Sequence, residues 1–202
     1  MASHYVLHVG IDSGVGNGGF LAPVFDQNRF EFIPIVDPYQ EYLSCPKYRE
    51  LTARNTKYGK FLSDFLPREL WNVRVHLDPS FPPYKKHCTY GEPPGSWLDR
   101  IHVGDWIFFV ESLVPFNEKM LADKLFQEYG NRQLLYSKYQ KGRMNKHIIG
   151  CLNVAGVFRK EDEDEPQLAE LDSHYDKDAM WKALKDNAHY VRDRESGGEH
   201  QY

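Results

Sequence analysis

Short apolar runs separated by turn-forming clusters predict strands along much of the chain. Residues 5–9, 20–25 and 30–36 have this pattern, and a polar Asp-Gln-Asn turn joins the last two. Residues 106–110 are aromatic or β-branched, which favours another strand. Residues 147–158 form the most apolar run, and we expect a central strand there with a bulge near Gly150 or Gly156.

Apolar residues spaced three or four apart predict helices in other segments. Residues 46–65 place most of their large apolar side chains roughly on one helical face. Residues 118–129 follow a candidate N-cap, Asn117, and precede a glycine. Residues 167–175 and 177–185 have the pattern of short amphipathic helices.

Composition indicates one soluble domain over residues 1–202. The net charge is −4, so no overall positive field attracts nucleic acid, and a polyanion would have to bind a local basic patch. No apolar segment is long enough to cross a membrane and no secretion signal is visible, so we expect a cytoplasmic protein. The 3 cysteines include no C-x-x-C pair, which argues against a disulfide framework or a zinc ribbon.

The longest irregular stretch lies between His76 and the strand that begins at Trp106. It is rich in proline, yet it also contains aromatic residues that favour burial: Phe81, Tyr84, Tyr90 and Trp97. Long irregular connections are usually functional loops or disordered segments. The aromatic content favours an ordered loop that shapes a site.

His76 and Asp78 open this stretch and are the first candidates for chemistry. Residues two apart in an extended segment face the same side, so both could point into one pocket. We expect one of them to act as a general acid or base. The alternatives are a metal site completed by His87 and a carboxylate such as Glu92, or a structural role in which the Asp-Pro step opens a turn.

A glycine-rich stretch, residues 10–19, follows the first strand. Such a loop can aim N–H groups at phosphate, although it lacks the Gly-Lys-Ser/Thr ending of a P-loop. If it lines a ligand, Asp12 is a catalytic candidate and Ser13 a ligand-binding one. The alternative is a generic tight loop.

Further ligand-binding candidates lie later in the chain. Tyr90 or Trp97 could stack on a base, and Arg192 could hold an anionic group. His189 lies with Arg192 in a polar segment that otherwise reads as a simple turn. Residues 138–146 are the most basic stretch, and they either guard a hairpin tip or contact a nucleic-acid backbone.

Several short motifs follow one another along the chain: Val9-Gly10-Ile11-Asp12-Ser13, His76-Leu77-Asp78-Pro79, Thr89-Tyr90-Gly91-Glu92, Gly104-Asp105-Trp106 and Asn187-Ala188-His189. In this order they are similar to the motifs of the third family of nucleotide modification associated domains. The chain resembles that family over nearly its whole length. The resemblance implies a link to base modification, supplies no known catalytic residue set, and implies one more strand after the Asn-x-His segment, so we expect a shortened version.

Residues 103–109, followed by a helix and an apolar strand, are also similar to the core of PUA, ASCH and EVE-type barrels, which bind RNA or modified bases. The predicted fold is therefore α+β, with a strongly bent mixed or antiparallel sheet and flanking helices. The sheet is expected either to stay open or to close into a PUA-like β-barrel.

Three functions remain open: an enzyme that modifies or processes a nucleotide or base, a non-catalytic reader of modified or flipped bases, and a metal-dependent hydrolase. In the first, a polar pocket would collect Asp12, Ser13, His76, Asp78, Tyr90, His189 and Arg192. Nucleotide, DNA or RNA is the expected partner and no membrane is involved. The sequence identifies no cofactor and no oligomeric state.

Overall fold

The computed structural model describes eight segments of the chain, with the backbone alone at residues 26, 145, 192 and 193: residues 2–11, 20–26, 29–41, 44–81, 88–91, 96–115, 145–160 and 166–195. The chain divides into two compact units. Unit 1 comprises Met1–Leu7, Leu77–Phe109 and Gly150–Tyr202, and unit 2 comprises His8–His76 and Val110–Ile149. Each unit is therefore built from segments that are far apart in the sequence.

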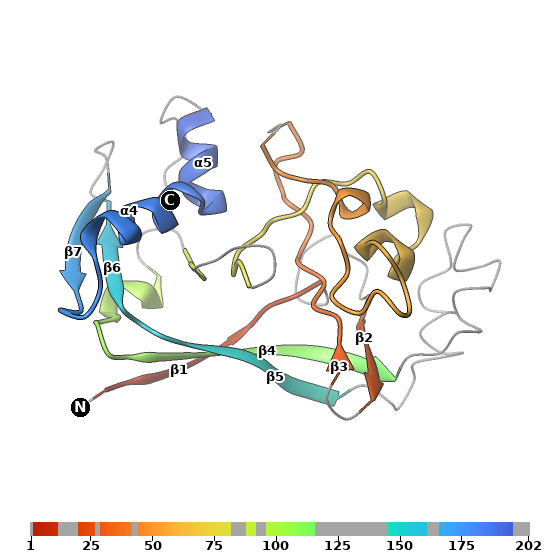
Figure 1. Ribbon diagram of the computed structural model, residues 1–202, viewed down its shortest axis with the longest axis horizontal. Helices are drawn as coiled ribbons and strands as arrows, with labels where there is room; N and C mark the ends of the chain where they lie inside the picture. The colour runs from red at the N-terminus through yellow and green to blue at the C-terminus, as the bar shows by residue number, and fades with distance from the viewer. Residues whose placement is uncertain are drawn as a thin grey trace. The chain divides into compact units, whose positions relative to one another are not determined.

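The fold class is α+β with a bent mixed sheet, as predicted (Figure 1). The sheet has five strands: β1 (His4–His8), β2 (Ala22–Asp26), β3 (Arg29–Phe30), β4 (Trp106–Pro115) and β5 (Asn145–Asn153). Their order is β1-β4-β2-β3, and β5 also pairs with β4. Strand β2 runs parallel to β4 and antiparallel to β3. No pairing among the described strands closes this sheet, so the PUA-like barrel stays a prediction.

The helix predicted over residues 46–65 is wrong. Short 3-10 turns occur there instead, namely η1 (Tyr48–Glu50) and η2 (Leu62–Phe65), followed by η3 (Arg68–Leu70). Side-chain carboxylates take backbone N–H groups that a helix would need, because Glu31 accepts from Arg54 and Asn55. Asp64 likewise accepts from Lys60 and Phe61.

The apolar positions of that segment nevertheless form the core of unit 2. Tyr48 and Leu62 are 0% exposed and Phe65 is 5% exposed. The Tyr48 hydroxyl donates to the carbonyl of Pro34 at 2.6 Å. Burial, with a smaller contribution from the charge of Glu111, raises the pKa of Tyr48 far above its usual range, so this hydroxyl keeps its proton.

Unit 1 contains a two-stranded antiparallel sheet, β6 (Gly156–Arg159) with β7 (Gln167–Leu171). The helix predicted over residues 167–175 is therefore wrong, because β7 pairs along β6 and alternates in exposure. The apolar run 147–158 is interrupted where Val154 exchanges backbone hydrogen bonds with Gly104 and Asp105.

Two helices follow in unit 1: α4 (Lys177–Lys185), as predicted, and α5 (Ala188–Glu195). Helix α4 begins after Asp176, whose side chain accepts from the N–H of Ala179. A 3-10 turn, η4 (Trp97–Arg100), precedes β4. The predicted helix 118–129 and the basic stretch 138–144 lie outside the described residues.

Candidate functional site

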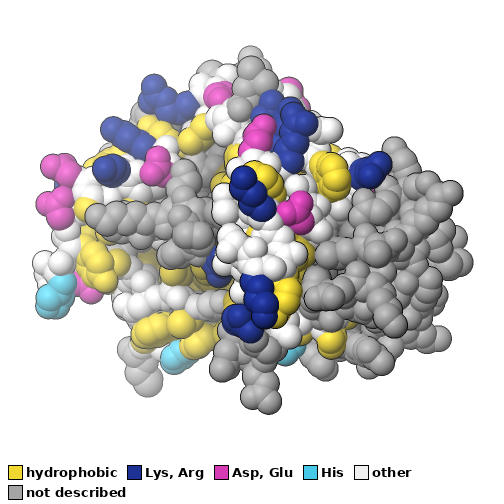
Figure 2. Space-filling model, turned by 45° about the vertical axis from the view of Figure 1, so that its right-hand side comes forward, with side chains coloured by type: hydrophobic (Ala, Val, Ile, Leu, Met, Phe, Trp, Pro, Cys, Tyr) yellow, Lys and Arg dark blue, Asp and Glu magenta, His cyan; other side chains and the backbone are white. Residues whose placement is uncertain are grey.

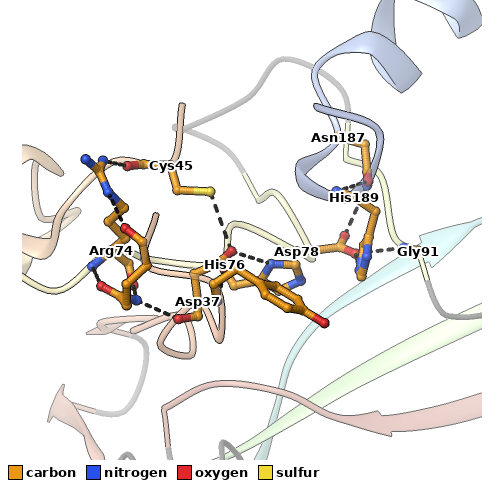
Figure 3. A network of polar contacts seen from close by, with 10 residues as sticks. Asp37, Cys45, Arg74, His76, Asp78, Gly91, Asn187 and His189 are labelled. Atoms are coloured by element: carbon orange, nitrogen blue, oxygen red, sulfur yellow. Dashed lines mark hydrogen bonds and ion pairs between the residues drawn. The ribbon is translucent and has the colours of Figure 1, made fainter. Parts of the chain in front are cut away.

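A buried carboxylate in unit 1, Asp78, is bonded to His189 of α5 (Figure 3). His189 Nε2 lies 3.1 Å from Asp78 Oδ2, and the backbone N–H of Gly91 donates to the same oxygen at 2.8 Å. The other oxygen accepts from the Asn187 side chain at 3.4 Å. Asp78 thus collects three donors from two segments that are distant from it in the sequence, so its position is set by the tertiary fold.

Asn187 connects this carboxylate to the start of α5. Its Oδ1 accepts from the backbone N–H of His189 at 2.8 Å, which is the geometry of a helix N-cap. Its Nδ2 donates to Thr89 Oγ1 at 3.0 Å as well as to Asp78. One amide therefore fixes both the start of the helix that carries His189 and the residue that His189 contacts.

Gly91 lies so close to this pair that a side chain there would be tightly packed. A Cβ on Gly91 would lie 3.0 Å from His189 Cδ2 and 3.5 Å from Asp78 Oδ2. Its neighbour Tyr90 stacks on Trp97 with ring centroids 6.3 Å apart, and Trp97 also packs against Tyr5 at 4.9 Å. A half-buried aromatic group thus adjoins the segment that supplies the Gly91 N–H.

A second carboxylate–histidine pair lies in unit 2. His76 Nδ1 lies 3.2 Å from Asp37 Oδ2, and the Cys45 thiol donates to the same oxygen at 3.5 Å. Asp37 Oδ1 accepts from the N–H of Tyr39 at 2.8 Å. Only Leu77 separates His76 from Asp78 in the chain, so one short segment supplies a member of each pair.

The surroundings of Asp37 are a dense set of backbone contacts. Arg74 donates to the carbonyls of Cys45 at 2.6 Å and Gln40 at 3.0 Å, and its own carbonyl accepts from the N–H of Asp37. The Gln40 amide donates to the carbonyl of Asp37. These bonds tie Asp37, Gln40 and Cys45 to the strand-like segment that ends at His76.

Each carboxylate selects one tautomer of its histidine. An Nε2–H directed at Asp78 leaves the lone pair of His189 on Nδ1, whereas an Nδ1–H directed at Asp37 leaves that of His76 on Nε2. The side chain of His189 is 18% exposed and that of His76 is 8% exposed. His189 is therefore the more accessible proton acceptor of the two.

A surface pocket of about 510 Å³ lies on the helices of unit 1, lined by Lys185, Tyr190, Val191, Arg194 and Glu195. Its volume is within the range of small-molecule sites. Lys185 and Arg194 provide positive charge, and Tyr190 provides an aromatic ring. Glu195 adds one negative charge, so the lining combines charges of both signs with an aromatic ring.

Carboxylates with a lowered pKa hold the turn before β4. Burial raises the pKa of Asp105, but N–H donors from Ser3 at 2.6 Å and His102 at 3.0 Å outweigh it and lower the pKa. The N–H of Val103 and the ring of His102 lower the pKa of Glu170. These charges stabilise the turn at Gly104, where φ is 92°.

Among the predicted site residues, the structure joins Asp78 to His189 and stacks Tyr90 on Trp97, while His76 contacts Asp37. Asp12, Ser13, His87, Glu92 and the side chain of Arg192 lie outside the described part of the chain. The sequence interpretation missed Asp37. Its signal was available, because Val36-Asp37-Pro38 repeats the apolar-Asp-Pro pattern of Leu77-Asp78-Pro79.

Comparison with known proteins completes this description. The sequence model of the family described as nucleotide modification associated domain 3 matches residues 6–201. The chain belongs to this family. Searches of curated proteins and of solved structures find no match. Within the described residues, no helix has the length and apolarity needed to span a membrane.

Proposed function

We propose that this nucleotide modification associated domain carries out, or reverses, a proton-dependent modification of a nucleotide or nucleic-acid base. In this proposal His189 is the general acid or base and Asp78 is its positioning residue. The observation that carries it is the buried Asp78 carboxylate, bonded at 3.1 Å to a histidine that remains partly accessible. The family membership supports nucleotides or bases as the substrate class.

The chemistry follows from the tautomer. With its Nε2–H held by Asp78, His189 accepts a proton at Nδ1 from a water molecule, a hydroxyl or an exocyclic amine of the substrate. The Asp78 carboxylate then stabilises the imidazolium that forms. A positioned acid or base of this kind accelerates a reaction by about 10²–10⁴-fold.

His76 is the second acid–base candidate, positioned by Asp37. Its greater burial makes it the weaker candidate for direct contact with a large substrate. In the same proposal, the pocket beside Lys185 and Arg194 holds the phosphate, and Tyr190 contacts the base or sugar.

The test is nucleoside mass spectrometry on DNA and RNA from cells with and without the gene, in a background that lacks other copies. We expect one nucleoside to appear or disappear with the wild-type gene. We expect His189→Gln and Asp78→Asn to remove that change and His174→Gln to retain it, since the His174 side chain is 87% exposed. Wild-type activity in the His189→Gln variant, with the protein folded, would exclude His189 as the acid or base.

A non-catalytic reader is the second candidate, favoured by the half-buried stack of Tyr5, Trp97 and Tyr90. A reader would leave nucleoside profiles unchanged and would still bind modified oligonucleotides. Trp97→Ala would then weaken binding, while His189→Gln would not. Metal analysis of chelator-free protein distinguishes a metal-dependent hydrolase from both of these functions, because only the hydrolase needs a stoichiometric metal ion.

A further inference from the structure

Positive charge is concentrated in the 3-10 region of unit 2, although the chain as a whole is acidic. Residues 44–75 contain seven Lys or Arg and three Asp or Glu, a net charge of +4, whereas the whole chain has −4. The basic residues are Lys47, Arg49, Arg54, Lys57, Lys60, Arg68 and Arg74. The local field of this region is therefore opposite in sign to that of the protein.

Two of the three acidic residues of this region accept hydrogen bonds from backbone N–H groups. Glu50 accepts from the N–H of Lys47, and Asp64 accepts from Lys60 and Phe61. In contrast, Lys57, Lys60 and Arg68 are exposed, and no ion pair to them occurs within the described part of the chain. The negative charges stabilise turns while these positive charges face solvent.

Aromatic rings hold the exposed cations in place. The Lys57 ammonium lies 5.1 Å from the centroid of Tyr58, and the Arg29 guanidinium lies 6.0 Å from the same ring. Lys60 lies 5.1 Å from the Phe61 ring, and Arg68 lies 5.8 Å from the Trp71 ring. Cation–π contacts of this kind restrict long side chains, which lowers the entropy lost when they bind an anion.

The arrangement at Tyr58 shows this most clearly. Phe25 stacks on the ring at 4.3 Å with an interplanar angle of 7°, so one face is covered by protein. Arg29 and Lys57 both lie close to this ring, and positive charges gathered near one point favour the approach of an anion. Figure 2 shows Lys and Arg side chains interspersed with hydrophobic ones on the face that it draws.

We infer that the basic region of unit 2, with the exposed cations Lys57, Lys60 and Arg68 beside aromatic rings, binds the phosphate backbone of single-stranded nucleic acid. Cations interleaved with aromatic rings are the pattern of sequence-independent strand binding. The inference deepens the proposed function, because it makes a polynucleotide the substrate. It rests on groups other than the carboxylate–histidine pairs.

The experiment measures binding of a fluorescent oligothymidylate of about 20 nucleotides, which exceeds the usual site size, by anisotropy over a series of salt concentrations. The test variant is Lys57→Gln/Lys60→Gln/Arg68→Gln. The matched control is Lys177→Gln/Lys182→Gln/Arg100→Gln, which removes the same charges from exposed positions in unit 1. Circular dichroism and urea denaturation verify that both variants are folded.

We expect the test variant to bind on the order of tenfold more weakly at low salt. Its slope of log K against log salt should fall by about 2, since each phosphate contact on a single strand contributes about 0.7. Unchanged binding in the test variant, or an equal loss in the control variant, would overturn the inference. So would tight binding to vesicles containing phosphatidylserine with no binding to the oligonucleotide.

Failure here is distinguishable from failure of the proposed function. If His189→Gln abolishes the nucleoside change while the basic variant binds normally, the proposed chemistry stands and the inferred binding by the basic region is wrong. If the basic variant loses binding and His189→Gln has no effect on nucleosides, the basic region binds nucleic acid and the proposed chemistry is wrong.

Discussion

Two carboxylate–histidine pairs, one in each unit, use the same residue types in different surroundings. In unit 2, Asp37 is 0% exposed and its oxygens accept from Tyr39, Cys45 and His76. In unit 1, Asp78 holds a histidine that is more than twice as exposed as His76. The residue types are therefore not enough to assign a role.

In the proposed function, this difference in exposure makes His189 the first acid–base candidate and gives the Asp37–His76 pair the larger share in stability. The Asp37–His76 pair lies among side-chain bonds to backbone groups from Gln40 and Arg74. The Asp78–His189 pair lies at the first turn of a short helix, where a side chain can reach solvent. Substitutions at Asp37 should affect stability first, and substitutions at His189 should affect activity first.

The largest expected effect is that of Asp37→Ala. It leaves the N–H of Tyr39, the thiol of Cys45 and the ring of His76 without their acceptor, and we expect a loss of about 3 kcal/mol in the free energy of unfolding. Urea denaturation measures it, with the exposed Asp99→Ala as control. A loss no larger than in the control would show that Asp37 has no structural role and would remove the contrast between the pairs.

Acid should weaken unit 1 at the turn held by Asp105. Because the pKa of Asp105 and of Glu170 is lowered in the folded protein, their contribution to stability is complete above the unfolded pKa of about 4 and is lost as pH falls through the folded value. Asp105→Asn should cost about 2 kcal/mol at pH 7. The penalty should shrink as the wild-type carboxyl becomes protonated.

Amide hydrogen exchange at residues 102–106, measured at pH 7 and near pH 3, tests the same point locally. We expect faster exchange at the lower pH after correction for intrinsic rates. A turn equally protected at both pH values would mean that the two carboxylates do not hold it.

Two substitutions at Asn187 distinguish its role as the N-cap of α5 from its hydrogen bond to Asp78. Asn187→Ala loses both and should cost about 1–2 kcal/mol. Asn187→Asp keeps the cap but places a second carboxylate near Asp78, which raises the pKa of the pair in the folded state. Its stability should therefore be close to wild type below pH 4 or so and should decrease as pH rises. Equal stability of Asn187→Asp and wild type at pH 7 would contradict the close approach of this side chain to Asp78.

Gly91→Ala should produce the smallest change in stability, below about 1 kcal/mol, because the His189 ring has to shift by only a few tenths of an ångström to admit a methyl group. The effect should instead appear in the NMR signals of the His189 ring. The ring of His174, whose side chain is 87% exposed, is the internal control. Equal shifts of both rings would indicate a general disturbance.

Local patterns in the sequence predicted several elements correctly. Helix α4 begins and ends where its amphipathic pattern does, and β4 begins at Trp106, after the predicted turn at Gly104. The mixed α+β class and the family also followed from short motifs. Helix α4 and the turn at Gly104 depend largely on contacts between residues close together in the chain, which a sequence pattern records.

Apolar spacing predicted the wrong secondary structure where residues distant in the sequence form hydrogen bonds with the backbone. Residues 46–65 bury the residues that the pattern selected, but Glu31 takes the N–H groups of Arg54 and Asn55, so a helix cannot form there. Within residues 167–175, the strand β7 forms over Gln167–Leu171 because β6 offers hydrogen bonds along it. Spacing indicates which side chains are buried, and it does not indicate which groups satisfy the backbone.

The sequence by itself determined the chemistry available, namely His76, Asp78 and His189 among many polar residues. Only the tertiary structure decided the pairing. Asp37 meets His76 across 39 positions, and Asn187 meets Asp78 across 109. Contacts of that separation arise when the whole chain folds, because no local pattern links residues so far apart. The same folding that joins these residues sets their exposure, which leaves His189 more accessible than His76.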